Sequence, residues 1–508
     1  MEKGNYSYYQ ETKMNEDKHL FVFGRENNKN LNHLELTLGQ GIQGIFAQDE
    51  VLFYLSNNEQ YDYWLNYLED EYSITNESIT LEEMILKYLD KYDDVGYILY
   101  DYTNNNESLN VATSLSGVLG YLPVDKSLEE KVSLLGLEMK LDVREMSERD
   151  LFDQYKDSLN NKGLVQLKPS ISHFRDYGIT NKFIYFYQEK STSQALNLRK
   201  DIHEWALKDS PIYGWGPGTE DSHVGIASRA GQFTIPSDYS YNTTVFSADI
   251  FKFDSIKTPN LNEEVEINPD KHYVTFIRSD GDNIQTWYNY FPFNQKDMAA
   301  IRGDFKFGWS IQPSLLDLAP SILKHTYDKA DINDYFVVAV SGHGYMYPSL
   351  YPNLDSYISS LNYYMEKTDL SVVQILDSGP YDEIIEAYSK APNLKGGMYM
   401  YGDKYAGGKG EIFWSKNGKP FVSFRESVWD VNILDVAGRV NNYEKNPYDI
   451  SGYTLINLHP WSHSYDDIKE LVSHFDSHIE IVSPDEFIDL IIKNVPKENK
   501  APWKKLVI

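Results

Sequence analysis

The sequence predicts an α/β protein, with an irregular seven-stranded β/α barrel in its C-terminal half and small α/β domains before it. From about Lys271, short apolar runs alternate with amphipathic helical stretches. This pattern is typical of a parallel sheet that is covered on both faces. The first 260 or so residues also alternate between strand and helix patterns. A chain of 508 residues is too long for one ordinary domain, so two to four are expected.

Residues 1–160 are predicted to form an N-terminal α/β region of two small subdomains, because helical and strand periodicities follow one another there. The predicted elements are helices at 61–72 and 81–92, a strand at 95–100, a helix at 110–119, a strand at 137–143 and a helix at 148–159. The segment Leu159-Asn-Asn-Lys-Gly163 is a plausible linker. No internal repeat is evident.

Residues 161–268 are predicted to be a loop-rich third segment. The stretches Tyr213–Gly218 and Gly231–Tyr239 contain glycines and prolines that cannot belong to a regular helix. Such a segment can close over one side of a site or simply connect two domains.

Residues 269–500 are predicted to form the barrel, because seven buried strand candidates follow one another there. They are His272–Ile277, Tyr335–Val340, Ser371–Leu376, Gly397–Tyr401, Pro420–Phe424, Tyr453–Leu458 and Ile479–Val482. Helical stretches at 315–327, 356–367, 381–389, 466–475 and 484–493 separate most of them. Asn417-Gly418 predicts a hairpin between residues 411–414 and the next strand.

Composition narrows the class of partner. The formal charge of −29 disfavours nucleic acid and anionic membranes, which bind positive surfaces. The absence of cysteine excludes disulfides, thiolate metal sites and a cysteine nucleophile. The 41 tyrosines and 9 tryptophans suit a carbohydrate binder, although core packing accounts for most of them. The sequence shows no secretory signal and no apolar run long enough to span a membrane, so a cytoplasmic location is expected unless the chain is trimmed. Oligomeric state is not predicted.

Ionisable side chains follow six of the predicted strands. In β/α barrels the active site lies at the carboxyl ends of the strands, so these side chains are expected on one rim. They are Asp280 and Asp282, His343, Asp377, Asp403, Arg425 with Glu426, and His459.

The cluster Ser279-Asp-Gly-Asp-Asn283 is the strongest chemical candidate. Two carboxylates on a glycine turn can supply an acid and a base, or ligands for a hard cation. The alternative is a turn whose aspartates cap the following helix. Glycoside hydrolysis needs two carboxyl groups roughly 5–10 Å apart. We therefore predict Asp280 and Asp282 as catalytic residues, with Asp377, Asp403 or Glu426 as candidate partners from later strands.

A metal site is the alternative chemistry. His459-Pro-Trp-Ser-His463 holds two histidines four residues apart, but Pro460 favours a turn over a helix. With Asp282, these histidines would resemble the Asp-His-His site of polysaccharide deacetylases, whose barrels are also seven-stranded and distorted. Those enzymes carry the histidine pair early in the barrel, whereas here it follows a late strand. No cofactor is expected, and Asp282, His459 and His463 are the ligands if a divalent metal is present.

The stretch Gly342-His-Gly-Tyr-Met-Tyr-Pro348 ends the predicted strand at 335–340. Glycine permits positive φ and close approach of a ligand, and proline fixes the exit of the chain. Tyr345 and Tyr347 present rings and hydroxyls at a rigid turn, which suits sugar binding. His343 can donate to a hydroxyl or be a satisfied structural histidine. Because the stretch holds no carboxylate, we expect it to hold substrate.

This stretch resembles the signature Gly-x-Gly-Tyr-x-Tyr-Pro, which names the GxGYxYP family of proposed glycoside hydrolases. The similarity covers nearly the whole chain and implies N-terminal accessory domains before a C-terminal barrel. The other stretches that carry it are Tyr273–Asn283, Phe307–Pro313, Leu316–Pro320, Gly418–Pro420, Arg425, His459–Trp461, Tyr213–Trp215 and Ser237–Asn242.

The expected function is hydrolysis of a poly- or oligosaccharide by carboxylate acid/base chemistry at the rim. A metal-assisted deacetylase or amidohydrolase and a non-catalytic glycan-binding protein are the alternatives. The residues expected to contact the carbohydrate are Trp309, His343, Tyr345, Tyr347, Asp403, Arg425, His459 and Trp461.

Overall fold

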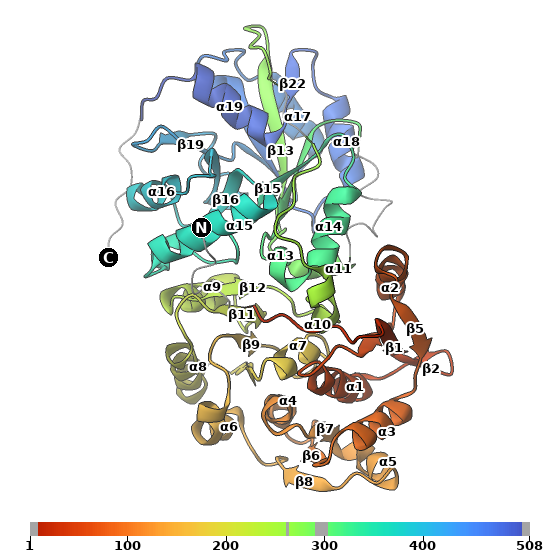
Figure 1. Cartoon of the computed structure of the whole chain (residues 1–508). Coiled ribbons are helices and arrows are strands. Elements are labelled where there is room, and N and C mark those ends of the chain that lie inside the picture. The colour runs from red at the N-terminus through yellow and green to blue at the C-terminus, as the bar shows by residue number, and fades with distance from the viewer. Residues whose placement is uncertain (1–8, 191, 261–263, 290–302, 500–508) are drawn as a thin grey trace. The chain divides into compact units, whose positions relative to one another are not determined.

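The computed structural model describes residues 9–190, 192–260, 264–289 and 303–499. The chain divides into two compact units, one mainly Ser7–Lys252 and the other mainly Phe253–Leu316 with Ile322–Ile508. Figure 1 labels their elements. Among the described residues, no helix is long and apolar enough to cross a membrane.

The N-terminal unit holds three small parallel sheets. Their strand orders are β4(Phe53–Leu55)-β1(His19–Phe23)-β5(Thr75–Ser78), β7(Leu122–Asp125)-β6(Tyr97–Tyr100)-β8(Met139–Asp142), and β10(Ile184–Phe186)-β9(Leu164–Gln166)-β11(Pro211–Gly214)-β12(Phe233–Ile235). The helices are α1 His33–Phe46, α2 Glu59–Tyr72, α3 Leu81–Lys91, α4 Glu107–Leu119, α5 Glu129–Leu134, α6 Glu148–Tyr155, α7 Arg175–Thr180, α8 Ser193–Trp205, α9 Glu220–Arg229 and α10 Thr243–Phe246. One apolar core joins the second and third sheets, through buried residues such as Ile98, Leu115, Ile184 and Ile202.

The segment predicted as loop-rich contains the four-stranded sheet. Its strands are only three or four residues long, and Gly214 at the end of β11 has a positive φ of 87°. Runs this short, interrupted by glycine, leave little periodicity in the sequence.

One large sheet dominates the C-terminal unit. Its order is β18(Ile412–Trp414)-β19(Pro420–Ser423)-β17(Gly396–Met400)-β16(Val372–Leu376)-β15(Asp334–Val338)-β14(Phe307–Ile311)-β13(His272–Arg278)-β21(Tyr453–Leu458)-β20(Glu426–Val428), and β22(Ile479–Ile481) pairs with β13. All pairs are parallel except β18 with β19, which confirms the hairpin predicted at Asn417-Gly418. The helices are α11 Ile284–Asn289, α13 Leu315–Leu318, α14 Pro320–Asp328, α15 Leu354–Thr368, α16 Asp382–Ser389, α17 Ile433–Asn441, α18 Tyr465–Ser473 and α19 Pro484–Asn494.

The α/β class is confirmed, but the sheet is an open curl of nine ordered strands rather than a seven-stranded barrel. All seven predicted strands exist. The prediction missed β14, because Gly308 and Ser310 interrupt its apolar pattern, and it missed β20, which follows β19 after two residues. The likeness to polysaccharide deacetylases stays a prediction.

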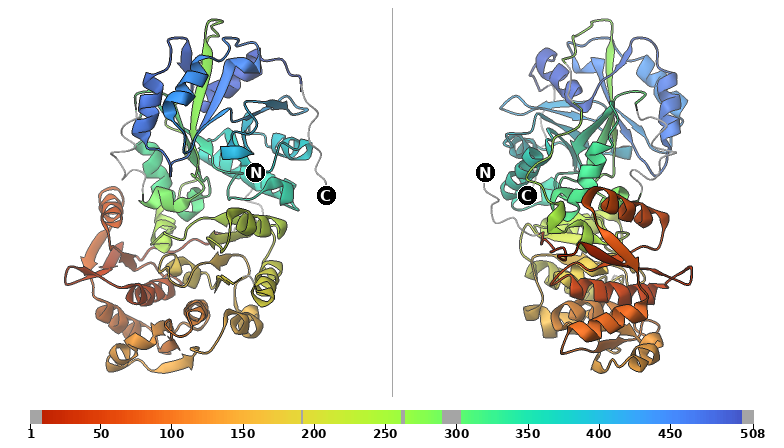
Figure 2. Two further views of the ribbon diagram at one scale, coloured as in Figure 1. Left: turned by 180° about the vertical axis from the view of Figure 1, so that it is seen from behind. Right: turned by 45° about the vertical axis from the view of Figure 1, so that its right-hand side comes forward.

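The sheet curls around α19. This helix packs against β13, β15 and β19, which lie far apart in the strand order. A short helix can contact all three only if it lies on the concave side. Accordingly, a Cβ on Gly308 would meet Pro484, and one on Gly396 would meet Ile488. The residues that share a face with these glycines therefore line the inside of the curl. Figures 1 and 2 show further helices flanking the strands.

Candidate active site at the carboxyl edge of the large sheet

Asp280 lies in the turn that follows β13, at the carboxyl edge of the sheet. Its φ is +66°. One carboxylate oxygen accepts a hydrogen bond from Ser279 Oγ (2.6 Å), and the other accepts one from Trp461 Nε1 (2.9 Å). The helix α11 follows, as the capping alternative expects, but Asp280 bonds to Ser279 and Trp461 rather than to amides of that helix. Asp282 is only 3% exposed, so Asp280 is the aspartate presented at the rim.

A row of aromatic rings lies beside Asp280. The ring of His459 stacks on Trp429 with centroids 4.0 Å apart and planes 7° apart. Trp429 in turn contacts Tyr405, at 5.1 Å between centroids. Trp461, which is 54% exposed, completes this aromatic rim of Tyr405, Trp429, His459 and Trp461. These residues come from the loops after β17, β20 and β21.

The charge of His459 is influenced by two carboxylates. Burial lowers its pKa, while the negative charges of Asp280 and Asp430 act in the opposite direction. Both aspartates are therefore close enough to the imidazole to influence its charge. Asp430 lies in the loop after β20, where its amide donates to Ser462 Oγ (3.3 Å).

Strained backbone is concentrated in these rim loops. Non-glycine residues with positive φ follow four of the strands: Asp280 (66°), Ser341 (61°), Lys404 (47°), Tyr405 (65°) and Asp430 (46°). Such conformations are uncommon outside glycine and cluster at functional sites, where surrounding contacts hold them. Lys404 Nζ provides one such contact, because it donates to the carbonyls of Trp429 (2.8 Å) and Asp430 (3.1 Å).

The inside of the curl is polar below this rim. Thr275 lies two residues before Ile277 and therefore on the same face of the sheet. Ile277 pairs with Gly308 and with Asn457, so Asn457 and Thr275 both lie on the face that lines the inside of the curl. Gln374 pairs with Met398, two residues from Gly396. All three polar side chains are fully buried. Within the described part of the chain, Thr275 Oγ1, Asn457 Oδ1 and both amide atoms of Gln374 have no hydrogen-bond partner. Groups of this kind are unfavourable unless something satisfies them.

The signature stretch forms a buried turn after β15. Gly342 has a φ of +141°, and a Cβ there would lie 2.6 Å from Tyr357 Oη, so both space and conformation require glycine. Tyr357 Oη also donates to the Gly344 carbonyl (2.6 Å). Tyr345 is buried and Tyr347 is half-buried, and their hydroxyls lie 3.4 Å apart.

His343 lies inside the protein. It is 3% exposed and stacks on Tyr357 with centroids 4.3 Å apart. Its carbonyl accepts from Gln312 Nε2 (2.6 Å). Burial lowers the pKa of His343 to about 3, so the imidazole is neutral near pH 7.

A pH dependence follows from this burial. As pH falls from 6.5 toward 3, unfolded His343 binds a proton that the folded protein excludes, so stability is lost. This single group is expected to remove about 2 kcal/mol between pH 7 and pH 5. His343→Phe keeps an aromatic ring against Tyr357 and should flatten the pH dependence of urea unfolding by that amount. An unchanged slope in the variant would show that His343 takes up its proton over the same pH range in the folded as in the unfolded protein.

Asp377 is committed to holding the signature stretch. Its carboxylate accepts from the amide (2.7 Å) and hydroxyl (2.6 Å) of Ser349, directly after Pro348, and from the amide of Ser378 (2.7 Å). Burial raises its pKa, and these hydrogen bonds oppose the rise. Asp377 therefore fixes the position of the signature stretch.

Arg425 and Glu426 are engaged in structural contacts. Glu426 pairs with Ile456, which is on the same face as Phe276, the face opposite the concave lining. Arg439 of α17 donates to its carboxylate through Nη2 (2.7 Å) and Nε (3.1 Å), and Tyr443 Oη donates as well. Arg425 donates to the carbonyls of Ser451 and Tyr453 (2.9 and 3.2 Å) and lies over the Tyr443 ring.

Trp309 and Asp403 occupy opposite environments. Trp309 is fully buried, donates from Nε1 to Asp334 Oδ1 (2.8 Å) and packs against Phe307 and Tyr465. It cannot stack on a substrate in this conformation. Asp403 is exposed at the start of the short turn that carries Tyr405.

The proposed metal ligands do not converge. His463 Nε2 accepts from the amide of Val431 (3.2 Å), and its Nδ1 lies 3.4 Å from Asp467. His459 Nδ1 lies 3.1 Å from Ser462 Oγ. Across the ranges that the structure describes, no group of three or more His, Asp or Glu side chains is arranged to hold a metal.

Three residues of this rim escape the sequence analysis: Tyr405, Trp429 and Asp430. The signal that could have found Trp429 and Asp430 is the length of the strand after Pro420. The strand is predicted to end at Phe424, but the extended segment continues to Val428 after a break of two residues. Trp429 and Asp430 are therefore the residues that follow it at the rim.

Three family models match this chain. The model described as "GxGYxYP_N second domain" matches residues 95–159, "GxGYxYP third domain" matches 161–248, and "GxGYxYP putative glycoside hydrolase C-terminal domain" matches 270–492. No curated protein matches.

A solved structure is similar over almost the whole chain. It is described as "a putative hydrolase from Bacteroides thetaiotaomicron VPI-5482", and it aligns with a TM-score of 0.86 at 28% identity. The alignment covers 96% of this chain and 97% of that one. The matches extend over both units, in the order of domains that the signature and its accompanying stretches predict. The chain therefore belongs to the GxGYxYP family.

Proposed function

We propose that this protein hydrolyses glycosidic bonds of a poly- or oligosaccharide at the carboxyl edge of the large sheet. The observation that carries the proposal is Asp280, a carboxylate on a strained turn beside four aromatic side chains at an exposed rim. The family model over this unit is described as a glycoside hydrolase domain, and the solved neighbour is described as a hydrolase.

The proposed chemistry uses Asp280 and Asp430. Glycoside hydrolysis needs one carboxyl group that protonates the leaving oxygen and a second that acts as base or nucleophile. Trp461 Nε1 and Ser279 Oγ fix the orientation of the Asp280 carboxylate, so Asp280 is proposed as base or nucleophile. Asp430 lies in the loop after β20, and its charge, like that of Asp280, acts on His459. Asp430 is proposed as the acid. Asp377 and Glu426 are left out because their carboxylates hold the fold.

The proposed sugar platform is the aromatic rim. Aromatic faces pack against the apolar C–H faces of sugar rings, and Trp461 and Trp429 are at least partly exposed. Tyr347, half-buried at the signature turn, is a further candidate contact.

The aromatic rim gives a testable expectation. Tyr405→Ala should weaken glycan binding by about 5- to 30-fold, because one stacking contact is worth roughly 1–2 kcal/mol. Titration calorimetry with the bound glycan measures the change. Tyr448→Ala is the matched control, since Tyr448 is a 53% exposed tyrosine of the same unit that is not part of the rim. Equal losses in the two variants would argue against the platform.

The reaction class is tested by a screen of polysaccharides and acetylated glycans. Release of reducing ends and release of acetate are measured for wild type, Asp280→Asn and the exposed α18 control Glu470→Gln. Reducing ends should be released by wild type and by the control only. Acetate release, or equal product from all three proteins, would reject the glycosidase proposal.

A non-catalytic glycan-binding protein is the second candidate. The observation that favours it is the engagement of Glu426 with Arg439 and of Asp377 with Ser349, which removes two of the carboxylates predicted for catalysis. A protein with this function binds a glycan on the aromatic rim and does not cleave it. The same screen separates the two functions, because the bound glycan is then recovered unchanged.

A further inference from the structure

The N-terminal unit contains a cavity of about 640 Å³, which is within the size range of small-molecule sites. We propose that it is a second carbohydrate site, which binds a neutral oligosaccharide without cleaving it. The cavity is lined by residues from two of the matched N-terminal domains, those over 95–159 and 161–248. It is separate from the rim described above, and the inference does not depend on catalysis there.

The cavity lies where parallel α/β sheets usually bind ligands. Its walls come from the loops after β6, β9 and β10 and from the first turns of α4, α6 and α8. Ligands of open parallel sheets bind beyond the carboxyl ends of the strands, where loops and helix N-termini supply polar groups. The order of strands and helices therefore predicts a ligand site of the N-terminal unit at this place.

The balance of charge favours a neutral ligand. Three acidic side chains (Glu107, Glu148 and Glu189) and three basic ones (Arg149, Lys168 and Lys190) line the cavity. The basic groups are partly committed: Arg149 pairs with Asp153 and Asp201 (3.0 and 2.6 Å), and Lys168 lies 3.6 Å from Glu189. A free anion would meet the carboxylates of Glu107 and Glu189, since that of Glu148 is fully buried, whereas a polyol meets donors and acceptors of both kinds. The amides of Gln188, Gln194 and Asn197 add further groups of that type.

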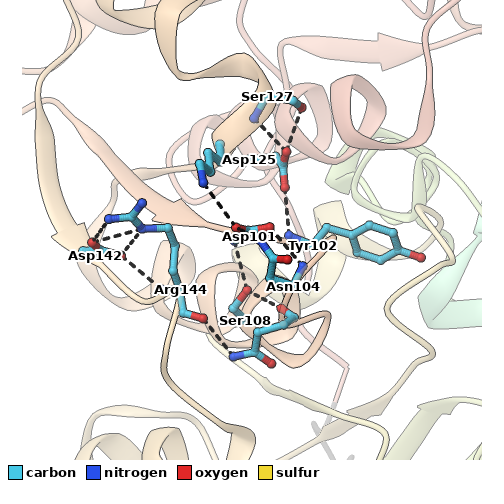
Figure 3. Close-up of polar contacts among 10 residues, drawn as sticks. Asp101, Tyr102, Asn104, Ser108, Asp125, Ser127, Asp142 and Arg144 are labelled. Carbon is cyan, nitrogen blue, oxygen red and sulfur yellow. Dashed lines mark hydrogen bonds and ion pairs between the residues drawn. The ribbon is translucent and has the colours of Figure 1, made fainter.

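Two tyrosines, Tyr102 and Tyr187, give the cavity apolar faces. Figure 3 shows the ring of Tyr102 pointing away from the carboxylates of Asp101, Asp125 and Asp142. Asp125 accepts from the amide of Tyr102 (3.0 Å) and from Ser127 (2.9 and 2.7 Å), while Asp101 accepts from Asn104 (3.1 and 2.7 Å). Asp125 therefore holds the backbone of Tyr102, while Asp101 and Asp142 bond to Asn104 and Arg144 of their own loops.

Glu148 fixes the other wall. It is fully buried at the start of α6, and its carboxylate accepts from Asn110 Nδ2 (2.8 Å), the Tyr187 amide (3.0 Å) and Gln188 Nε2 (2.9 Å). Burial raises its pKa to about 7. Gln188 has a φ of +51°, a strained conformation that such contacts hold. Because the Glu148 carboxylate already accepts hydrogen bonds from groups of the wall, it is not free to act on a ligand. The cavity is therefore better suited to binding than to catalysis.

The test is binding of the full chain to an array of neutral oligosaccharides from glucans, xylans, mannans and galactans, with inorganic phosphate as the anionic probe. Hits are titrated by calorimetry against wild type, Tyr187→Ala and the double variant Gln194→Ala/Asn197→Ala. The double variant changes only exposed residues of α8, so it should fold. We expect at least one neutral oligosaccharide whose binding falls tenfold or more in both variants.

Two controls separate this site from the rim. Glu204→Ala, exposed on the last turn of α8 and not part of the cavity lining, should leave binding unchanged. Asp280→Asn should also leave it unchanged, even if the rim proves catalytic. The proposal is overturned if no neutral oligosaccharide binds, if binding survives both cavity variants, or if phosphate binds in place of the sugars.

Discussion

Replacing Gly281 with alanine is expected to abolish activity and to lower the free energy of unfolding by roughly 2–4 kcal/mol. A Cβ at this position would lie 1.7 Å from the carbonyl oxygen of Ser310 and 2.3 Å from its carbonyl carbon. Both are backbone atoms of β14, so no side chain can rotate away. The turn that carries Asp280 would have to separate from the neighbouring strand, losing the bond from the Gly281 amide to Ser310 Oγ (3.0 Å).

Gly438→Ala is the matched control for this effect. Gly438 lies within α17, and a Cβ there would have no neighbour within 4 Å. Alanine in a helix interior is favoured over glycine by about 0.5–1 kcal/mol, so this variant should be slightly more stable and fully active. Urea unfolding and a glycan-release assay report both properties. An active Gly281→Ala protein of wild-type stability would mean that the turn does not lie against β14.

Arg439→Ala is expected to destabilise the protein by about 2–4 kcal/mol, because it leaves the largely buried Glu426 carboxylate without its half-exposed cation. The side chain of Glu426 is 7% exposed and lies 2.7 Å from Arg439. Glu426→Gln should destabilise less, by roughly 1–3 kcal/mol, since neutral acceptors still meet Arg439 and Tyr443. In both variants, the folded fraction should retain the wild-type rate of glycan cleavage.

This result distinguishes a structural glutamate from a catalytic one. Lys324→Ala removes an exposed pair with Asp328 and should change stability by less than about 1 kcal/mol. Stability is measured by denaturant unfolding, and the rate is normalised to folded protein. A Glu426→Gln variant of normal stability that loses cleavage would return Glu426 to the catalytic site and remove Asp430 from it.

Much of the fold could be predicted because buried parallel strands leave a strong signal. Runs such as Tyr453–Leu458 are mainly apolar, and every strand predicted in the C-terminal half exists. β14 was missed because glycine and serine lie in its sequence, and their place in the sheet depends on neighbours: Gly308 faces Pro484 of α19. Whether the sheet closes into a barrel depends on pairing between distant strands, which periodicity does not report.

The edge of the sheet that carries the candidate site could be predicted from the sequence, but the side chains exposed there could not. The rule that side chains after parallel strands share one edge brings Asp280, His459 and Trp461 to the rim. The same rule also nominated Asp377 and Glu426, whose partners Ser349 and Arg439 come from other loops and helices. Trp309, predicted as a carbohydrate contact, is fully buried. Burial and hydrogen-bond partners decide between rim and core, and neither can be read from sequence position.

The role of Asp280 is measured most directly by kcat/KM for glycan cleavage in Asp280→Asn, Asp430→Asn and the double variant, with glycan affinity measured in parallel. Each single variant should lower kcat/KM by about 10²–10⁴-fold, while affinity changes only a few-fold. The kcat/KM of the double variant should be only slightly lower than that of the less active single variant, because residues that act together have non-additive effects. A wild-type rate in Asp280→Asn would contradict the account.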